Sequence, residues 1–298
     1  MAVKTRAERS RIAGESSEVF GEVGTSSPTL PVPLIVGYSS GMSVPRRLST
    51  RVLAQTPWLS LLAHQVEDPS GLTREVNTLD FADWVVASAR TVEGRWVLVR
   101  QFRHGVEGMT VEPAGGIIDD GESPQDAALR ELMEETGYGG GNVTPLGSAH
   151  PNAALSPNRV HYFFVDGVQK LAEPDQAPDE LTEVLLLSDE EVELGLDSGS
   201  FSHALGMLGL MRARGVASRR GHLATLLKLE EYQLDRVRAL AQRLRPGLTA
   251  EDLQSPHDFP ELDDPDWHFE DGQLAGIKAA RMALARSLDV FDGSTSAH

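Results

Sequence analysis

The chain has 298 residues, no cysteine, 40% hydrophobic residues and a formal net charge of −17. Its length suits one large domain or a domain with extensions. The missing cysteines exclude disulfides and thiolate metal sites and fit a reducing cytoplasm, which is the expected location. The negative charge argues against general nucleic-acid binding and against anionic membrane surfaces. No apolar run approaches the ~20 residues that span a membrane.

Composition divides the chain into five expected parts. Residues 1–30 are rich in Ser, Glu, Gly and Arg without apolar periodicity, which is typical of a disordered tail. Residues 31–56 are expected to form an N-terminal arm, and residues 57–214 a domain of strands and helices. Apolar residues at helical spacing predict a helical appendage over residues 220–290, followed by a second tail at residues 291–298.

Strands dominate the expected domain. Runs of β-branched and aromatic residues between turn formers predict strands over residues 58–66, 74–79, 81–90, 96–100, 105–112, 142–150, 159–165 and 183–187. Helical patterns follow over residues 189–196 and 201–214. Strands interrupted by one helix and followed by others predict an α/β fold, in which a mixed sheet lies between helices in an α/β/α sandwich.

One short helix between these strands carries charged residues in an unusual pattern. The stretch GIIDDGESPQDAALRELMEETGY, residues 116–138, begins as a glycine-rich loop. Ser123 is the expected N-cap and Pro124 the first helical residue, while Gly137 suits the left-handed position that ends a helix. At about 100° per residue, three glutamates lie on one face of this helix and its apolar residues lie on the opposite face.

These glutamates, Glu131, Glu134 and Glu135, repel one another because like charges one turn apart are unfavourable. A hard divalent cation would remove that cost. Mg²⁺ accepts carboxylate oxygens, water and substrate phosphates as ligands, and Mn²⁺ is a second candidate. A solvated acidic helix face is the alternative interpretation. The intervals to the loop glycines, to Glu122 and to Arg130 favour the cation site.

The whole stretch resembles the Nudix box, G-x5-E-x7-R-E-U-x-E-E-x-G-U with U a bulky apolar residue, and meets it at every specified position. The resemblance covers roughly residues 57–214 and is greatest to the ADP-ribose and nucleoside-diphosphate-sugar pyrophosphatases. Residues 98–103 resemble the strand before the box in those enzymes, and residues 112–115 resemble its lead-in. Residues 159–164 resemble the strand after the substrate loop, and residues 179–184 the acidic loop that follows.

The resemblance implies hydrolysis of the pyrophosphate linkage in a nucleoside-diphosphate-linked compound, with ADP-ribose or another nucleotide sugar expected first. Dinucleoside polyphosphates or other nucleotides are the second substrate class. Glu131 and Glu135 are implied as the principal metal ligands, and the carbonyl of Gly115 as a backbone ligand. Glu134 is implied as a further or water-mediated ligand with a catalytic role. Bound metal would neutralise phosphate charge and lower the pKa of water.

Four further box residues are implied to support the site. Gly116 and Gly137 belong to the loop and to the helix end. Arg130 is expected to pair with a box carboxylate, because its forked donors suit two oxygens. Glu122 is expected to brace Arg130 or to hold outer-shell water rather than to bind metal directly.

A base must take a proton from the attacking water. In the resembling pyrophosphatases a carboxylate on the loop after the substrate strand often serves, and Glu180 aligns best, with Asp179 and Glu183 as its neighbours. Arg103 and Arg159 are candidate phosphate clamps, because arginine offers a forked donor set. Three histidines are assigned no role, since a single strand histidine is more often packed or at the surface: His64, His104 and His161.

The sequence of the helical appendage contains no motif that indicates a particular chemistry. Helices are expected over residues 221–244 and 270–288, with a Thr-capped turn at residues 249–252 between them. The boundary with the preceding domain is expected near residues 217–220, after the helix at residues 201–214. The appendage is expected to clamp the domain, to mediate self-association or to bind a partner, and the resembling pyrophosphatases are commonly homodimers. The alternative function is a sensor that binds a nucleoside-diphosphate-linked compound without turnover and reports through the helical appendage, although the intact box acids favour an enzyme.

Overall fold

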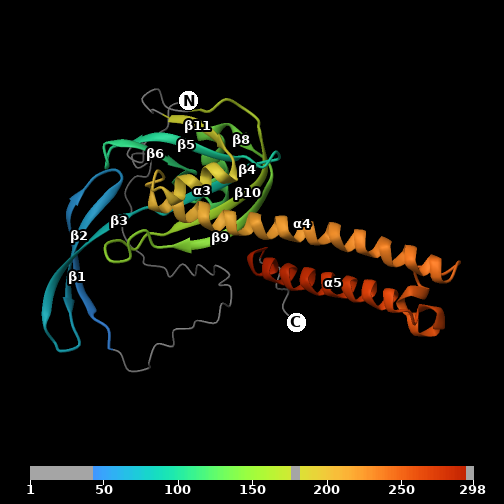
Figure 1. Ribbon diagram of the computed structural model, residues 1–298. Helices are drawn as coiled ribbons and strands as arrows, with labels where there is room; N and C mark the ends of the chain where they lie inside the picture. The colour runs from blue at the N-terminus through green and yellow to red at the C-terminus, as the bar shows by residue number, and fades with distance from the viewer. Residues whose placement is uncertain (1–42, 176–181, 293–298) are drawn as a thin grey trace. The chain divides into compact units, whose positions relative to one another are not determined.

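The computed structural model describes residues 43–175 and 182–292 of the chain (Figure 1). The tail expected over residues 1–30 lies outside the described residues. So do the first part of the expected arm and residues 293–298.

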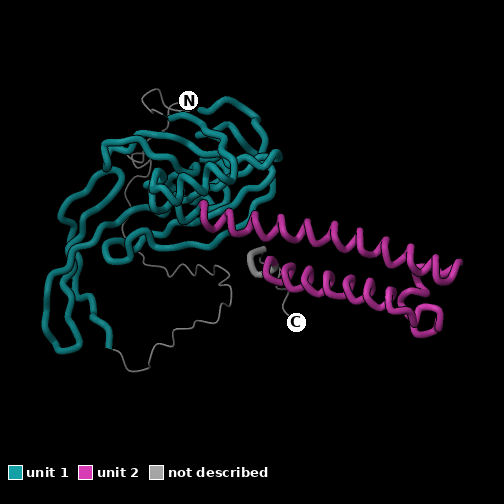
Figure 2. The backbone as a smooth tube through the Cα atoms, viewed as in Figure 1, with its two compact units in different colours: residues 1–209 teal, residues 210–298 magenta. Residues whose placement is uncertain are grey.

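Two compact units make up the chain, residues 1–209 and residues 210–298 (Figure 2). The domain limits expected from the sequence, residues 57–214 and 220–290, stay predictions. Each unit has its own buried cluster of apolar side chains.

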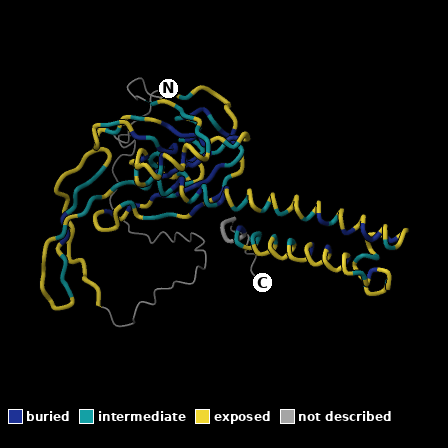
Figure 3. Tube along the Cα trace, in the orientation of Figure 1, coloured by how far each residue is buried: buried dark blue, intermediate teal, exposed yellow. Residues whose placement is uncertain are grey.

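A three-stranded antiparallel sheet opens the described part of the first unit. β1 (Arg46–Gln55), β2 (Leu59–Glu67) and β3 (Thr73–Phe81) pair in that order. β1 begins within the segment expected to be an arm, and every residue of this edge strand is exposed (Figure 3). His64 is buried in the middle strand, where its two ring nitrogens lie 2.8 and 2.7 Å from threonine hydroxyls on the neighbouring strands. Its contacts are therefore those of a packed sheet residue.

An eight-stranded sheet forms the body of the first unit. Its strands are β4 (Trp84–Thr91), β5 (Trp96–Arg103), β6 (Gly108–Glu112), β7 (Ala114–Ile117), β8 (Tyr138–Gly139), β9 (Asn142–Ala149), β10 (Val160–Lys170) and β11 (Thr182–Leu187). The main path runs β11–β5–β4–β10–β8, with β6 paired to β5, β7 to β4 and β9 to β10. β4 and β10 are parallel whereas the other pairs are antiparallel, which confirms the predicted mixed sheet.

One face of this sheet is covered by α2 (Pro124–Thr136). The helix and the strands contribute small and branched apolar residues, which allow a close approach between the two layers. The buried members of this cluster are Val85, Ala87, Ala89, Val97, Ala114, Ala127, Ala128, Leu132, Phe163, Val165 and Val168. At the edge of this apolar side, Glu131 and Glu135 of α2 reach the backbone of β7, whereas Glu134 is half-exposed.

The opposite face is covered by α3 (Asp189–Asp197) and by the first turns of α4 (Ala204–Leu244). α4 approaches the sheet at Gly206 and Gly209. A Cβ on these glycines would lie 3.0 and 2.8 Å from side-chain carbons of β6 and β4. Helices therefore lie on both faces, and the predicted α/β/α sandwich is confirmed.

The second unit is built from the rest of α4, three short 3-10 turns and α5 (Pro265–Asp292). Apolar residues from both helices, from two of the three turns and from the segments beside them form a cluster with the buried Trp267. The predicted capping box is present between the helices, where Asp252 accepts the Thr249 backbone N–H at 2.7 Å and Thr249 accepts that of Asp252 at 3.3 Å.

The helix break predicted near residues 217–220 is wrong. α4 continues through this segment as one helix of 41 residues. The boundary was expected here because the resemblance to the family ends at residue 214. Gly215 and Gly221 do not end the helix, because glycine in a helix interior costs only about 1 kcal/mol relative to alanine and leaves every backbone hydrogen bond possible. No proline lies within α4, and the first one after its start is Pro246, just beyond the end of the helix. None of the described helices combines the length and apolar character that crossing a membrane requires.

Replacing Gly221 with alanine tests this continuity. No atom lies within 4 Å of the added Cβ, so Gly221→Ala should stabilise the helix by about 0.8–1 kcal/mol. Gly199→Ala is the matched control, because it also meets open space but has φ +75°, where a side chain costs roughly 1–2 kcal/mol. Native-state hydrogen exchange measures both changes. Loss of protection around residue 221 in Gly221→Ala would contradict a continuous helix.

Candidate metal and catalytic site

Local chemistry holds both ends of α2. Ser123 has an extended backbone, and its hydroxyl accepts the N–H of Asp126 at 3.1 Å, with Pro124 at the first helical position. At the other end Gly137 adopts φ +71°, and its N–H donates to the carbonyl of Met133 at 2.8 Å. The caps predicted from the sequence are therefore present, and they keep the helix that carries the glutamates in one place.

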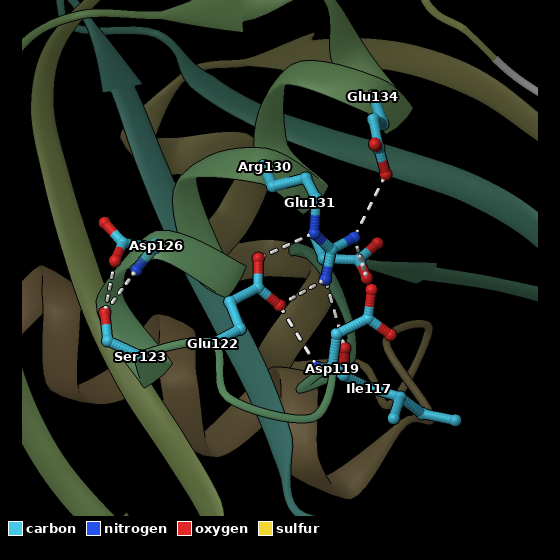
Figure 4. A network of polar contacts seen from close by, with 8 residues as sticks. All are labelled: Ile117, Asp119, Glu122, Ser123, Asp126, Arg130, Glu131 and Glu134. Atoms are coloured by element: carbon cyan, nitrogen blue, oxygen red, sulfur yellow. Dashed lines mark hydrogen bonds and ion pairs between the residues drawn. The ribbon is translucent and has the colours of Figure 1, made fainter. Parts of the chain in front are cut away.

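Arg130 lies at the centre of the polar network of the loop and helix (Figure 4). Its Nε and Nη2 donate to the two oxygens of Glu122 at 2.8 and 2.9 Å, and Nη2 also donates to the Ile117 carbonyl at 3.2 Å. Its Nη1 donates to Glu131 at 2.8 Å and to Glu134 at 3.1 Å. The bond with Glu122 raises the pKa of Arg130 and lowers the pKa of Glu122. Arg130 thus ties the loop to the acidic face of the helix.

Glu131 is half-buried against Gly116. A Cβ on Gly116 would lie 2.4 Å from Glu131 Oε1, so only glycine leaves the carboxylate its present position. Burial raises the pKa of Glu131, although the hydrogen bond from Arg130 acts in the opposite direction. The carboxylate is therefore held at a place where its negative charge is not fully compensated.

Glu135 lies one turn further on, and its carboxylate accepts the N–H of Gly115 at 3.2 Å. Burial, and then the negative charge of Glu131, raise the pKa of Glu135 to about 8. The bond from Gly115 and the charge of Arg103 act against this rise. A Cβ on Gly115 would lie 2.3 Å from the carbonyl oxygen of Val85, so this backbone is close-packed against β4.

These two carboxylates fit a divalent cation. Both are held where burial disfavours their charged forms, and a cation beside them would remove that cost. Within residues 43–175 and 182–292, no three acidic or histidine side chains already converge as a metal site. Glu131 and Glu135 could hold a cation together with a backbone oxygen such as that of Gly115, water and substrate phosphate. Mg²⁺ usually binds to only one or two protein carboxylates and keeps several of its water ligands.

A second network lies next to the first and centres on Glu112. This carboxylate is 2% exposed, accepts Nε and Nη2 of Arg103 at 2.8 and 2.9 Å, and accepts the Thr110 hydroxyl at 2.7 Å. His203 Nδ1 contacts its other side. Burial alone would raise the pKa of Glu112, but the bonds from His203, Arg103 and Thr110 outweigh it and lower the pKa to about 2.

Glu112 and His203 were not recognised in the sequence as site residues. The only signal was the place of Glu112 at the start of the lead-in to the box. His203 is about 90 residues away in the chain, so nothing local connects the two. Arg103, by contrast, was singled out. The structure anchors its guanidinium on a buried carboxylate and places its positive charge close enough to Glu135 to lower that pKa.

The other predicted residues are not all brought to the box. Glu180, with the loop around it, lies outside the described residues. Its neighbour Glu183 is described and forms an ion pair with Arg100 across β11 and β5. Arg159 lies at the start of β10, and its guanidinium donates to Ser148 of β9 at 2.7 and 3.0 Å. Because β9 is on the far side of β10 from β4 and β7, the guanidinium of Arg159 is bound to a strand that does not border the box.

Comparisons with known proteins show which family this chain is similar to. The model of the NUDIX domain matches residues 82–204. The ADP-ribose pyrophosphatase of Bacillus subtilis is 31% identical over 134 residues, which is 45% of this chain and 72% of that protein. The ADP-sugar pyrophosphatase of Mus musculus is 29% identical over 185 residues, or 57% and 85%. The crystal structure of an ADP compounds hydrolase shares the fold, with a TM-score of 0.55 and 19% identity over 61% of this chain and 99% of that one.

Gly116→Ala tests the place of Glu131. The new Cβ would displace the Glu131 carboxylate, so affinity for Mg²⁺ or Mn²⁺ should fall by about 10- to 100-fold, the range seen when residues that position metal ligands are changed. Isothermal titration measures the affinity. Gly105→Ala is the control, because its Cβ meets open space. Equal affinities for both variants would remove Glu131 from the site.

The raised pKa of Glu135 predicts how stability changes with pH when no divalent cation is present. The folded protein holds this proton more tightly than the unfolded chain, with a pKa of about 8 against 4.5. The free energy of unfolding should therefore fall as pH rises between these values, and added Mg²⁺ should restore it at pH 8. Urea denaturation in chelator, compared with Glu135→Gln, isolates this group. Parallel pH curves for the two proteins would contradict the assignment.

Proposed function

The chain belongs to the Nudix family, and on this premise we propose that it hydrolyses the pyrophosphate linkage of a nucleoside-diphosphate-linked compound. ADP-ribose or another nucleotide sugar is the proposed substrate class. The carrying observation is the pair of half-buried glutamates beside the Gly115–Gly116 backbone, because burial disfavours their charged forms and a cation would stabilise them. Two relatives named as ADP-ribose and ADP-sugar pyrophosphatases support the substrate class.

The box residues take distinct roles in this proposal. Glu131 and Glu135 bind a divalent cation, Mg²⁺ or Mn²⁺, with the Gly115 carbonyl as a backbone ligand. When bound, the cation neutralises phosphate charge and makes water easier to deprotonate. Glu134 is half-exposed beside Arg130, so it is placed to orient water rather than to be a principal ligand. Arg130 keeps the carboxylates in position through its bonds to the loop.

Arg103 is proposed to bind a phosphate oxygen of the substrate. Its guanidinium is already anchored by the buried Glu112, so little side-chain freedom is lost when substrate binds. Thr110 and His203 hold Glu112 from two further directions. Arg103 would therefore offer a fixed positive charge beside the cation, where the negative charge of the transition state is greatest.

Glu180 is proposed as the base that accepts a proton from the attacking water. This assignment rests on the resemblance to the pyrophosphatases and on the position of the loop just before β11. Its neighbour Glu183 is a weaker candidate, since its carboxylate is engaged by Arg100. Asp179 shares the segment outside the described residues.

Turnover by the purified protein tests the function. With Mg²⁺, ADP-ribose should give AMP and ribose 5-phosphate, and Glu135→Gln should remove most of this activity while the protein stays folded. ADP-glucose, GDP-mannose and dinucleoside polyphosphates complete the panel. Hydrolysis of dinucleoside polyphosphates alone would replace the proposed substrate class. Tight binding of nucleotide sugars without any product would establish a sensor in place of an enzyme.

Glu180→Gln should lower kcat by roughly 10²- to 10⁴-fold with little change in KM, the effect expected when a general base is lost. The acid limb of the pH–rate profile should also flatten. Glu183→Gln is the matched control, and it should retain most of its activity because that carboxylate is committed to Arg100. The reverse result, with Glu183→Gln nearly inactive and Glu180→Gln active, would move the base to Glu183.

A further inference from the structure

A polar cluster stands apart from the box, at the starts of β4 and β10 and the end of β9. Its members come from three chain segments and are called the Arg159 cluster: Asp83, Ser148, His150, Arg159 and His161. Asp83 joins the segments. One of its oxygens accepts the backbone N–H of Arg159 at 2.8 Å, and the other lies 3.3 Å from His161 Nε2.

Arg159 is braced by neutral groups. Its Nε and Nη2 donate to the Ser148 hydroxyl at 3.0 and 2.7 Å, and its Nη1 lies 3.2 Å from His150 Nε2. Because arginine can only donate, this histidine nitrogen must accept. The ring hydrogen of His150 is then on Nδ1, where it is donated to the Asn158 carbonyl at 3.0 Å. The histidine thus supports the guanidinium without neutralising it.

The segment behind Arg159 is rigidly anchored. Asn158 is 3% exposed, donates to the Ala82 carbonyl at 3.2 Å and accepts the hydroxyl of the buried Ser156 at 2.6 Å. These buried bonds fix the backbone from which Arg159 projects. The guanidinium is therefore held in one orientation before any ligand arrives, which lowers the entropic cost of binding.

The charge of Arg159 is left available. Of the five N–H groups of a guanidinium, three are engaged by Ser148 and His150, which leaves two. No carboxylate in the described parts of the chain forms an ion pair with Arg159, and its side chain is exposed. Arg46, Arg51 and Arg100, by contrast, are also exposed but each pairs with a glutamate. A guanidinium that is held in place, and whose positive charge no carboxylate neutralises, offers a fork of N–H donors that suits a phosphate group.

Strand register places this fork relative to the box. Gly116 pairs with Val85 on β4, Val85 with His161 on β10, and His161 with Ser148 on β9. Ser148 is therefore three strand spacings, or roughly 14 Å, from Gly116. Directly paired residues lie on one face of a sheet, and Val85 belongs to the cluster under α2. The fork and the box thus share a face but are too far apart to hold the same phosphate.

We propose that the Arg159 cluster binds a further phosphate group of the substrate, one that lies beyond the hydrolysed diphosphate. This inference rests on the proposed function and adds a substrate class to it: nucleoside-diphosphate sugars that carry a phosphomonoester. Arg159 supplies the two N–H donors and the charge, and the Ser148 hydroxyl supplies a third donor. Asp83 is turned to the Arg159 backbone and to His161 rather than to the guanidinium.

Matched substrates test the proposal. ADP-ribose is compared with ADP-ribose 1″-phosphate and with ADP-ribose 2′-phosphate, which carry the extra phosphate on opposite sides of the linkage. The wild-type protein should prefer one of the phosphorylated compounds by about tenfold or more in kcat/KM, a difference that arises from KM. Arg159→Gln should abolish the preference and leave ADP-ribose within about threefold of wild type. Arg159→Lys, which keeps the charge but not the fork, should retain part of it.

Arg74→Gln is the control, because it removes another exposed arginine from β3, and it should keep the wild-type preference. If Arg159 only stabilises the loop, replacing it should change kcat/KM for all three substrates by the same factor. That result overturns the proposal. So does a wild-type protein that treats the three compounds alike, whether or not the variants fold. If none of the compounds is hydrolysed, the proposed function fails. The ratio of the Kd of ADP-ribose to that of each phosphorylated compound then tests whether the Arg159 cluster binds the extra phosphate.

Discussion

The site depends on the placing of two carboxylates, Glu131 and Glu135, where water only partly solvates them. Burial raises both pKa values, and the negative charge of Glu131 raises the pKa of Glu135 further. Such a pair persists only when the surrounding structure imposes it. Here the capped helix, the close-packed Gly115–Gly116 backbone and the bond from Arg130 impose it together. A cation bound beside the two carboxylates would remove this cost, and the relief would add to the free energy of binding.

Much of this arrangement could be predicted from the sequence because its signals are local. The N-cap serine, the following proline and the terminal glycine define α2, and glutamates at fixed intervals define its acidic face. The strand patterns predicted a mixed sheet between helices, and the structure confirms it. Each of these features depends on residues close together in the chain, where spacing alone fixes the geometry.

What the sequence could not show depends on contacts between distant segments. The bond between Glu112 and His203 joins residues about 90 positions apart, and the orientation of Arg159 depends on Ser148 of a neighbouring strand. The predicted break in α4 failed for a different reason. Glycine weakens a helix without ending it, and the good helix formers around Gly215 and Gly221 decide the outcome. The change in sequence pattern near residue 220 suggests a boundary, but the free energy of the backbone does not require the helix to end there.

The second unit contains none of the residues assigned to the site. It has its own apolar cluster around Trp267 and a largely buried Glu270 that accepts a hydrogen bond from Gln233 at 2.6 Å. Every residue assigned to the site lies in the first unit. The three roles expected from the sequence for the second unit, clamping the domain, self-association and binding of a partner, stay predictions.

A crystal structure with Mn²⁺ and α,β-methylene ADP-ribose, an analogue that cannot be cleaved, tests the central claim most directly. Anomalous scattering from manganese locates the cation without reference to any assumed ligand. The account predicts a peak in contact with Glu131 and Glu135 and with an oxygen of the bound diphosphonate. A diphosphonate bound with no metal peak at these two carboxylates would contradict it.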